Sequence, residues 1–247
     1  MKTIILVLLL CGFTSSLFAK EYSSSQQDRL IAKILNLQLS RQISLERSVS
    51  ALLTRYPEKI DVVVDAALER NPQRYRSIML GAMRAEPVLA CSVVEVMLDK
   101  NVAPAEEIVR IAIEAEPAYA HEIVNIAASR QPQNVKNFVR IAIKTDPVTH
   151  NSVLKNTIDS HPESTFDIFL GAIKALPDQV VSLVKNTLMS DPKQSEEVIT
   201  YAIKESHKDL SKEIVESAIA AGVDKKVAIE TAINAGAEPL ALADIDN

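Results

Sequence analysis

Histidine is the side chain best suited to proton transfer near neutral pH and to zinc ligation, and this chain contains four of them. They are His121, His150, His161 and His207. They occupy four different positions of the repeat described below, and none has a second His or Cys at ligand spacing. His161 directly precedes a proline, where a helix-capping or solvent-exposed role is expected. The histidines therefore predict no zinc site.

Nucleophiles, acid pairs and phosphate loops are the other sources of chemistry, and none has the spacing that its reaction needs. Cys91 has neither a partner cysteine nor a basic neighbour to lower its pKa, which favours a structural thiol. Glu106–Glu107 and Glu196–Glu197 fall in the first turns of expected helices, where carboxylates favour the helix dipole. The glycines form no phosphate-binding motif, and no G-x-S-x-G elbow occurs. We therefore predict no catalytic, cofactor-binding or metal-binding residues and a protein that is not an enzyme; an enzyme with residues scattered over one face is the alternative.

Two polar patterns recur at an interval of thirty residues, an arginine and a Lys-Asn-Thr tripeptide. The candidate partner-binding residues are Arg110, Arg140, Lys155, Asn156, Thr157, Lys185, Asn186 and Thr187. Equal positions in a stack of repeats lie above one another, so these side chains would form ladders. On a concave face such a ladder would hydrogen-bond a peptide backbone or a glycan. The alternative is that duplication copied a solvated edge that binds nothing.

The elements that would position these residues are set by a lattice of prolines at intervals of fifteen residues. Its members are Pro57, Pro72, Pro87, Pro117, Pro132, Pro147, Pro162, Pro177 and Pro192. The lattice skips Val102 and continues over His207, Gly222 and Ala237. Proline suits the first position of a helix, and it keeps the residue before it out of the α region. Those preceding residues, expected to be N-caps or to favour the helix dipole, include Asn71, Glu86, Glu116, Asp146, His161 and Asp191. Each proline is therefore predicted to begin one helix and to end the preceding one.

Apolar residues repeat on the same lattice. Counted from the lattice residue as position 1, positions 7, 8 and 12 are mostly aliphatic and position 11 is mostly Ala, as in Ile108, Val109, Ile113 and Ala112. Offsets of one, four and five residues place these side chains on one side of a helix, whereas a strand would require alternation. Each unit is therefore predicted to be one amphipathic helix of about eleven to twelve residues.

The repeat of the sequence itself is longer than one helix. IVRIAIEAEP at 108–117 matches FVRIAIKTDP at 138–147, thirty residues later, and IMLGAMRAEP at 78–87 matches IFLGAIKALP at 168–177, ninety residues later. Short connections make neighbouring helices antiparallel, so the structural unit is a pair of helices. This pair resembles the short HEAT-like repeat class over about residues 42–236. The resemblance implies an all-α, right-handed-type α-solenoid of about six thirty-residue helical pairs.

The chain ends differ from the repeats. Residues 1–19 have a positive start, a short apolar run and a cleavage-like end at Ala19, as in a secretory signal peptide. We expect residues 20–27 to be a flexible polar lead, residues 28–236 to be a single α-solenoid domain with an N-terminal capping helix, and residues 237–247 to be a frayed acidic tail. Localisation would then be exported, either periplasmic or secreted.

Composition limits the classes of partner. The chain has 27 Lys and Arg residues against 32 Asp and Glu, with both signs interspersed, so nucleic-acid binding has little electrostatic support. We expect a non-enzymatic scaffold that binds another protein along the solenoid, with assembly of the cell envelope or extracellular matrix as a cellular setting. The alternatives are an apolipoprotein-like chain that binds membrane lipid, and an enzyme or glycan binder that uses the concave face. The sequence does not predict an oligomeric state.

Overall fold

The computed structural model describes residues 24–246, and these residues form fifteen α-helices and no strand. The helices are α1 (Ser24–Ser40), α2 (Leu45–Arg55), α3 (Ile60–Arg70), α4 (Tyr75–Ala85), α5 (Ala90–Asp99), α6 (Ala105–Ala115), α7 (Ala120–Arg130), α8 (Val135–Thr145), α9 (His150–Ser160), α10 (Thr165–Ala175), α11 (Val180–Ser190), α12 (Ser195–Glu205), α13 (Ser211–Ala220), α14 (Lys225–Ala235) and α15 (Pro239–Asp246). The prediction of an all-α helical-repeat solenoid is confirmed.

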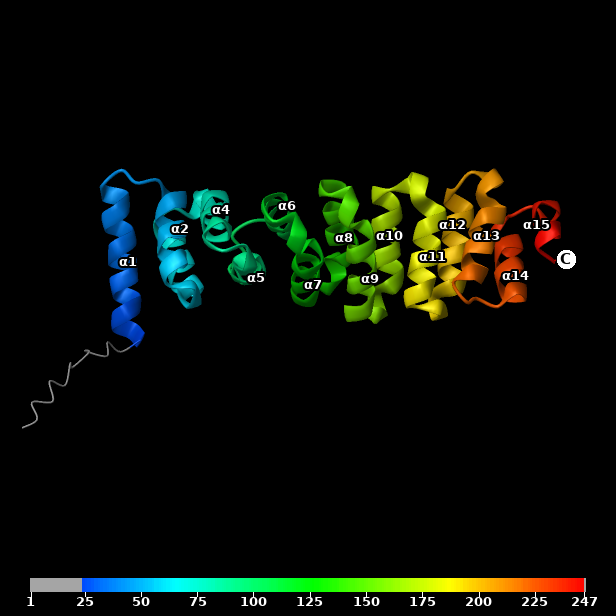
Figure 1. Ribbon diagram of the computed structural model, residues 1–247, viewed down its shortest axis with the longest axis horizontal. Coiled ribbons are helices and arrows are strands. Elements are labelled where there is room, and N and C mark those ends of the chain that lie inside the picture. Colours follow the sequence, from blue (N-terminus) through cyan, green and yellow to red (C-terminus); the bar gives the residue numbers. More distant parts are fainter. Residues whose placement is uncertain (1–23, 247) are drawn as a thin grey trace, which may run out of the picture.

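The helices form two layers in an elongated stack (Figure 1). Each helix packs against its neighbour along the chain and against the helix two places away. The even-numbered helices α2 to α14 therefore make one layer, and the odd-numbered helices α1 to α15 make the other. Extensive contacts join only helices one or two places apart, which is the defining property of a solenoid.

The unit of fifteen residues consists of a 3-10 turn, an α-helix and one linking residue. In the unit that begins at Pro132, a three-residue 3-10 turn (η5, Pro132–Asn134) leads directly into the eleven-residue helix α8. One further residue, Asp146, separates α8 from the next proline. The 3-10 turns are η1 (Pro57–Lys59), η2 (Pro72–Arg74), η3 (Pro87–Leu89), η4 (Pro117–Tyr119), η5 (Pro132–Asn134), η6 (Pro147–Thr149), η7 (Pro162–Ser164), η8 (Pro177–Gln179), η9 (Pro192–Gln194) and η10 (Lys208–Leu210). Each proline thus begins a helical segment as predicted, but its first turn is 3-10 rather than α.

The residue before most of the lattice prolines makes backbone hydrogen bonds to two elements. The N–H of Glu116 donates to the carbonyl of Ala112 in α6, and the carbonyl of Glu116 accepts from the N–H of Tyr119 at the end of η4. Its backbone, at φ −135° and ψ 72°, lies outside the helical region, as expected before proline. The N–H and C=O of one residue therefore end one helix and begin the next.

Side-chain capping is rarer than the sequence suggests. Of the predicted caps, Asp146 and Asp191 accept hydrogen bonds from the second residue of the following turn, at 3.2 Å each. Asn71 makes no such bond, so the prediction of an N-cap is wrong for this residue. Glu86, Glu116 and His161 make none either. The side chain of Asn71 instead donates to the carbonyl of Ala67 in the preceding helix, at 3.1 Å. The backbone bond described above satisfies the N–H of the third residue of the turn, whereas the side-chain caps serve the N–H of the second.

Where the lattice lacks proline, left-handed residues usually end the preceding helix. The φ angle is +64° at Gln42, +49° at Asn101, +101° at Gly222 and +109° at Gly236. These residues lie at or one residue before the lattice positions 42, 102, 222 and 237. A left-handed residue just beyond the C-terminus satisfies the last carbonyls of a helix, and it does not require proline.

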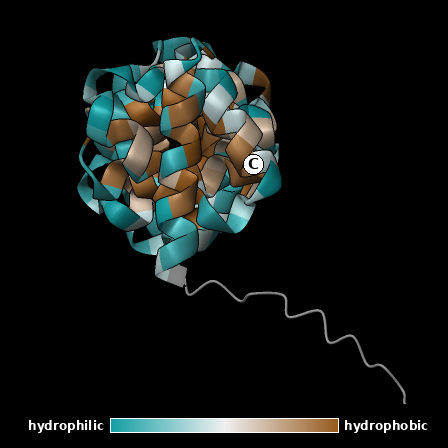
Figure 2. Cartoon of the chain, turned by 90° about the vertical axis from the view of Figure 1, so that its left-hand side faces the viewer, coloured by the Kyte–Doolittle hydropathy of each residue, from teal (hydrophilic) through white to brown (hydrophobic). Residues whose placement is uncertain are grey.

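The core lies between the layers and runs the length of the stack. The aliphatic pairs at positions 7 and 8 and the small residues at position 11 are buried, as predicted. Seen from the end closed by α1, hydrophobic segments fill the interior and hydrophilic ones form the rim (Figure 2). None of the helices in the described range is both long and apolar enough to cross a membrane.

Two glycines allow the closest helix packing. The helix pairs with the most extensive contacts are α2 with α4 and α8 with α10. A Cβ atom added at Gly81 on α4 would lie 2.6 Å from the carbonyl oxygen of Glu46, and one at Gly171 on α10 would lie 2.5 Å from that of Lys136. The ninety-residue recurrence of Leu-Gly-Ala in the sequence therefore marks two positions where a helix backbone approaches its neighbour.

The ends of the chain are more ordered than expected. Helix α1 begins at Ser24, so the expected flexible lead over residues 20–27 is helical from residue 24 onward. Helix α15 occupies most of the expected frayed tail, and it packs on α13 through the buried Leu242. The expected signal peptide over residues 1–19 lies outside the described residues.

Candidate functional site

The predicted ladder residues divide between the two layers. Arg110 and Arg140 lie on α6 and α8 in the even layer. The two Lys-Asn-Thr tripeptides lie on α9 and α11 in the odd layer. Both pairs of helices pack side by side, as a thirty-residue repeat requires. The eight residues therefore belong to two separate surfaces rather than to one site.

The arginines do not behave alike. Arg110 forms ion pairs with Glu107 and Glu114 on its own helix, the second at 3.3 Å. Among the described residues Arg140 has no ion pair, because the corresponding positions on α8 are Asn137 and Lys144. The repeated arginine therefore does not produce a repeated electrostatic environment.

Three of the six candidate polar residues in the odd layer interact with other groups of the protein. Lys155 pairs with Asp159 at 2.5 Å, Asn156 donates to the carbonyl of Ser152, and Asn186 donates to the side chain of Asn151 across to α9. Thr157 and Thr187 are 0% exposed, so these two residues cannot contact a partner. They occupy position 11, which faces the core, and this excludes them from the predicted ladder.

The remaining chemically competent side chains do not converge. Cys91 is half-buried, and its burial, followed by the charges of Glu122 and Glu95, raises the pKa of the thiol. A thiol with a raised pKa is a poor nucleophile at neutral pH. Within residues 24–246, no group of three or more His, Cys, Asp or Glu side chains is arranged to hold a metal ion.

A hollow opens instead where the fifteen-residue lattice is interrupted. Between α12 and η10 there are two linking residues, Ser206 and His207, where one is usual. Helix α13 has ten residues rather than eleven, and α14 begins in the original register at Lys225. The extra residue is therefore accommodated within one unit. The backbone at Ser206 is fully extended, with φ −98° and ψ 166°, unlike most of the other linking residues.

The hollow has a volume of about 570 Å³ and lies between this linker and the turn at η8. We call it the α12 hollow, and its lining residues are Ile173, Lys174, Pro177, Asp178, Val180, Tyr201, Glu205, Ser206, His207 and Leu210. Aliphatic and aromatic groups alternate with charged ones, and acidic side chains outnumber lysine. Such a surface suits an apolar side chain with a cationic group beside it.

One residue that lines the hollow, Tyr201, belongs to an aromatic cluster. The ring of Tyr201 contacts Phe166 and Phe169 of α10 edge to face, with centroids 6.1 and 6.2 Å apart. Edge-to-face contacts fix ring orientation as well as burying area. Partial burial, together with the charge of Glu205, raises the pKa of the Tyr201 hydroxyl. The tyrosine is therefore neutral at physiological pH and available as a hydrogen-bond donor.

The α12 hollow was not predicted from the sequence, although signals for it existed. Ile203, Ile219 and Ile233 are spaced by sixteen and then fourteen residues, which indicates the displaced linker. His207 replaces proline on the lattice, and Phe166, Phe169 and Tyr201 lie within three consecutive units. Only the packing of α10 against α12 shows that these features belong together.

The fold and the site define an all-α helical-repeat solenoid with a surface hollow at the displaced Ser206–His207 linker. Comparisons with protein-family models, with curated proteins and with solved structures find no match.

Proposed function

We propose that this chain is an exported, non-enzymatic scaffold that binds another protein, and that the α12 hollow receives a segment of that partner. The proposal rests on one observation, the hollow that lies beside the displaced Ser206–His207 linker. Most of the other proline-initiated units close with a single linking residue, so joining two helices does not require the second residue of this linker.

The lining of the hollow indicates the chemistry of the partner. Tyr201 offers an orienting ring and a hydroxyl, and Asp178 and Glu205 place carboxylates beside it. A peptide segment with an aromatic or long aliphatic side chain next to Lys or Arg fits this pattern. Because Tyr201 is already held in place by Phe166 and Phe169, the scaffold loses little conformational entropy when the segment binds.

The lipid-binding alternative requires apolar helix faces that are open to a bilayer. In this stack the apolar positions of the units are buried between the layers, which supports the protein-binding proposal over the lipid one. Circular dichroism with and without vesicles tests this point. A protein-binding solenoid keeps its full helicity without lipid, whereas an apolipoprotein-like chain gains helicity on adding vesicles.

Export is part of the proposal and has its own test. The predicted cleavage after Ala19 would make Lys20 the first residue of the mature chain. Intact-mass measurement of the protein recovered from the periplasm and the medium checks this cleavage directly. Recovery of the uncleaved chain from the cytoplasm alone would contradict export.

Affinity capture with a matched pair of variants tests the hollow. Asp178→Lys reverses a charge in the hollow, and Glu163→Lys makes the same change at the same position of the preceding unit, outside the hollow. Both side chains are exposed, so neither change should disturb folding. We expect partners captured from envelope extracts to be lost with Asp178→Lys and kept with Glu163→Lys. Equal capture by both variants would show that the partner binds elsewhere.

A further inference from the structure

The exposed large apolar side chains are concentrated at the two ends of the stack. Within the described residues, those at the ends are Leu30, Leu37, Ile43, Val227, Ile233 and Leu240, and those in between are Val88, Val148 and Met189. Terminal repeats of a solenoid normally present a polar outer face, because they have no further repeat to cover them. Both ends of this stack depart from that rule.

At the N-terminal end the apolar residues form a stripe along α1. Leu30 and Leu37 are each 50% exposed and are separated by two helical turns, so they lie on one side of the helix. Ile31 and Leu35 are buried against the rest of the stack. Figure 2 shows this end, with hydrophobic segments along the helix that faces the viewer. Helix α1 thus has one apolar side in the core and a second in solvent.

The two ends carry opposite charge. Residues 24–56 contain five Lys and Arg against two Asp and Glu, whereas residues 208–246 contain four Lys against eight Asp and Glu. Arg29, Lys33 and Arg41 on and beside α1 are exposed and have no ion pair within the described part of the chain. The acid on α1, Asp28, is engaged by Lys59 at 3.0 Å. The exposed charge of α1 is therefore positive.

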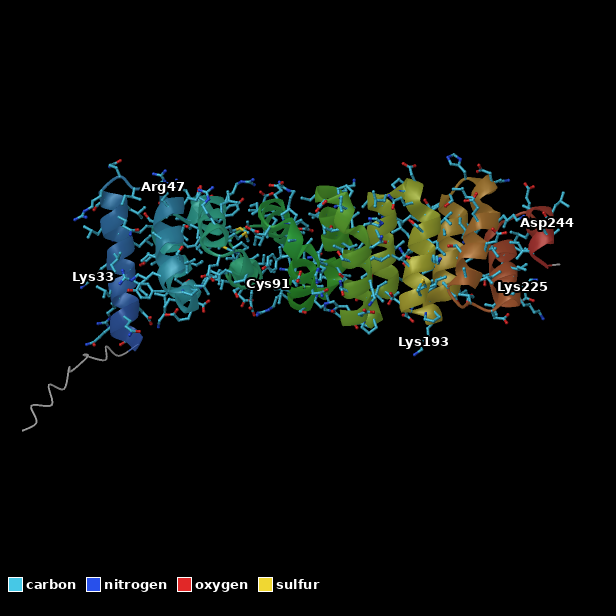
Figure 3. The ribbon with its side chains drawn as sticks, in the orientation of Figure 1. Lys33, Arg47, Cys91, Lys193, Lys225 and Asp244 are labelled. Carbon is cyan, nitrogen blue, oxygen red and sulfur yellow. The ribbon has the colours of Figure 1, made fainter. Side chains whose placement is uncertain are left out.

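The opposite end presents carboxylates around an exposed leucine. Leu240 on α15 is 88% exposed, and the side chains of Glu238 and Asp244 nearby are 69% and 85% exposed. These acids pair loosely with Lys208 and Lys212, at 3.6 and 3.3 Å. Solvent-exposed pairs of this kind are weak, so the carboxylates can exchange partners at little cost. Figure 3 shows Lys33 and Asp244 at opposite extremities of the molecule.

We propose that the N-terminal end of one copy binds the C-terminal end of a second copy. The N-terminal end surface consists of Leu30, Lys33, Leu37 and Arg41, and the C-terminal end surface consists of Ile233, Glu238, Leu240 and Asp244. Apolar residues of one surface cover those of the other, and cations meet carboxylates around them. Because the two surfaces differ, the contact is heterologous and continues into a ring or an open filament.

Sedimentation velocity of the full chain over a range of concentrations tests the proposal. We expect the average mass to rise with concentration beyond that of a dimer. Leu37→Glu places an acid in the basic end, and Leu240→Lys places a cation in the acidic end, so each variant should self-associate at least about tenfold more weakly. Both positions are exposed, and circular dichroism confirms that each variant is folded. Val148→Glu, at an exposed apolar residue in the middle of the stack, is the matched control and should associate like the wild type.

Mixing the two end variants distinguishes a heterologous contact from a symmetric one. Leu37→Glu retains a competent C-terminal end and Leu240→Lys retains a competent N-terminal end, so an equimolar mixture should associate more strongly than either variant alone. Wild-type protein that stays monomeric would overturn the proposal. Undiminished association of Leu240→Lys alone would also overturn it, since the C-terminal end would then play no part.

Discussion

Replacing Gly171 by Ala tests whether close backbone approach holds α8 and α10 together. In an exposed helix interior this change stabilises by about 1 kcal/mol, because Ala has the higher helix propensity. Here the new Cβ would lie 2.5 Å from the carbonyl oxygen of Lys136 and 3.0 Å from Cβ of Val139. Overpacking of this kind costs about 1–3 kcal/mol, since the two helices must separate. We expect the overpacking to prevail and give a net loss of up to about 2 kcal/mol.

The assay combines urea unfolding with hydrogen exchange. With an m value of about 3 kcal/mol/M, the expected loss lowers the urea midpoint by up to about 0.7 M. In a stack whose helices contact only near neighbours, the loss should also be local, so the amides of α8 and α10 exchange faster while those of α2 and α4 do not.

Gly81→Ala is the matched control, because Gly81 occupies the equivalent position on α4. Its Cβ would lie 2.6 Å from the carbonyl oxygen of Glu46, so we expect the same loss with the affected amides moved to α2 and α4. Two distant sites should give additive losses in the double variant. A midpoint that rises in either single variant would refute the reasoning, because helix propensity would then outweigh the contact.

Three further predictions follow from single residues. Thr157→Val and Thr187→Val should each raise the free energy of unfolding by about 1 kcal/mol in urea titrations, because the buried hydroxyls have no hydrogen-bond partner and valine keeps their shape; a loss of stability would mean that the hydroxyls are satisfied. Gly222→Val should destabilise the fold by about 1–2 kcal/mol and Gly222→Asn by much less, because φ at this residue is +101°, which asparagine tolerates better than valine. No atom lies within 4 Å of an added Cβ, so the backbone angle alone opposes the substitution. Equal losses from the two variants would contradict this reason. The Cys91 thiol should react slowly with iodoacetamide at pH 8, and its reaction should accelerate only above the usual thiol pKa, because the pKa of this thiol is raised. Glu122→Gln should lower that pKa and speed the reaction, measured by mass spectrometry of samples quenched at successive times. An unchanged rate would exclude the charge of Glu122 as a cause of the raised pKa.

Helix positions could be predicted from the sequence because the residues that mark the start and the buried side of each helix lie within its own unit. Pro132 marks the start of a helical segment, and Phe138, Val139 and Ala142 mark its buried side, without reference to any other unit. Helix α15 lacked such a signal. Pro239 lies off the lattice, so its helix became evident only from the packing of Leu242 on α13.

The candidate site was harder to predict because it depends on contacts between units. Repetition alone suggested the Lys-Asn-Thr ladder, yet repetition is also what buries Thr157 and Thr187 at the core-facing position 11. The α12 hollow lies beside the opposite kind of feature, a break in repetition at His207. The end surfaces were likewise invisible, since periodicity cannot show that Leu30 and Leu37 lack a neighbouring repeat to cover them.

The displaced linker has a consequence for how this protein can change. The extra residue at Ser206–His207 is offset by one residue fewer in α13, so α14 begins where an uninterrupted array would place it. Because extensive contacts extend no further than two helices, an insertion in one turn leaves distant units undisturbed. A lineage could therefore remodel the surface at one linker, or at another, without altering the distance between the molecule's two ends. Local surface shape and overall length are independently adjustable in such an architecture.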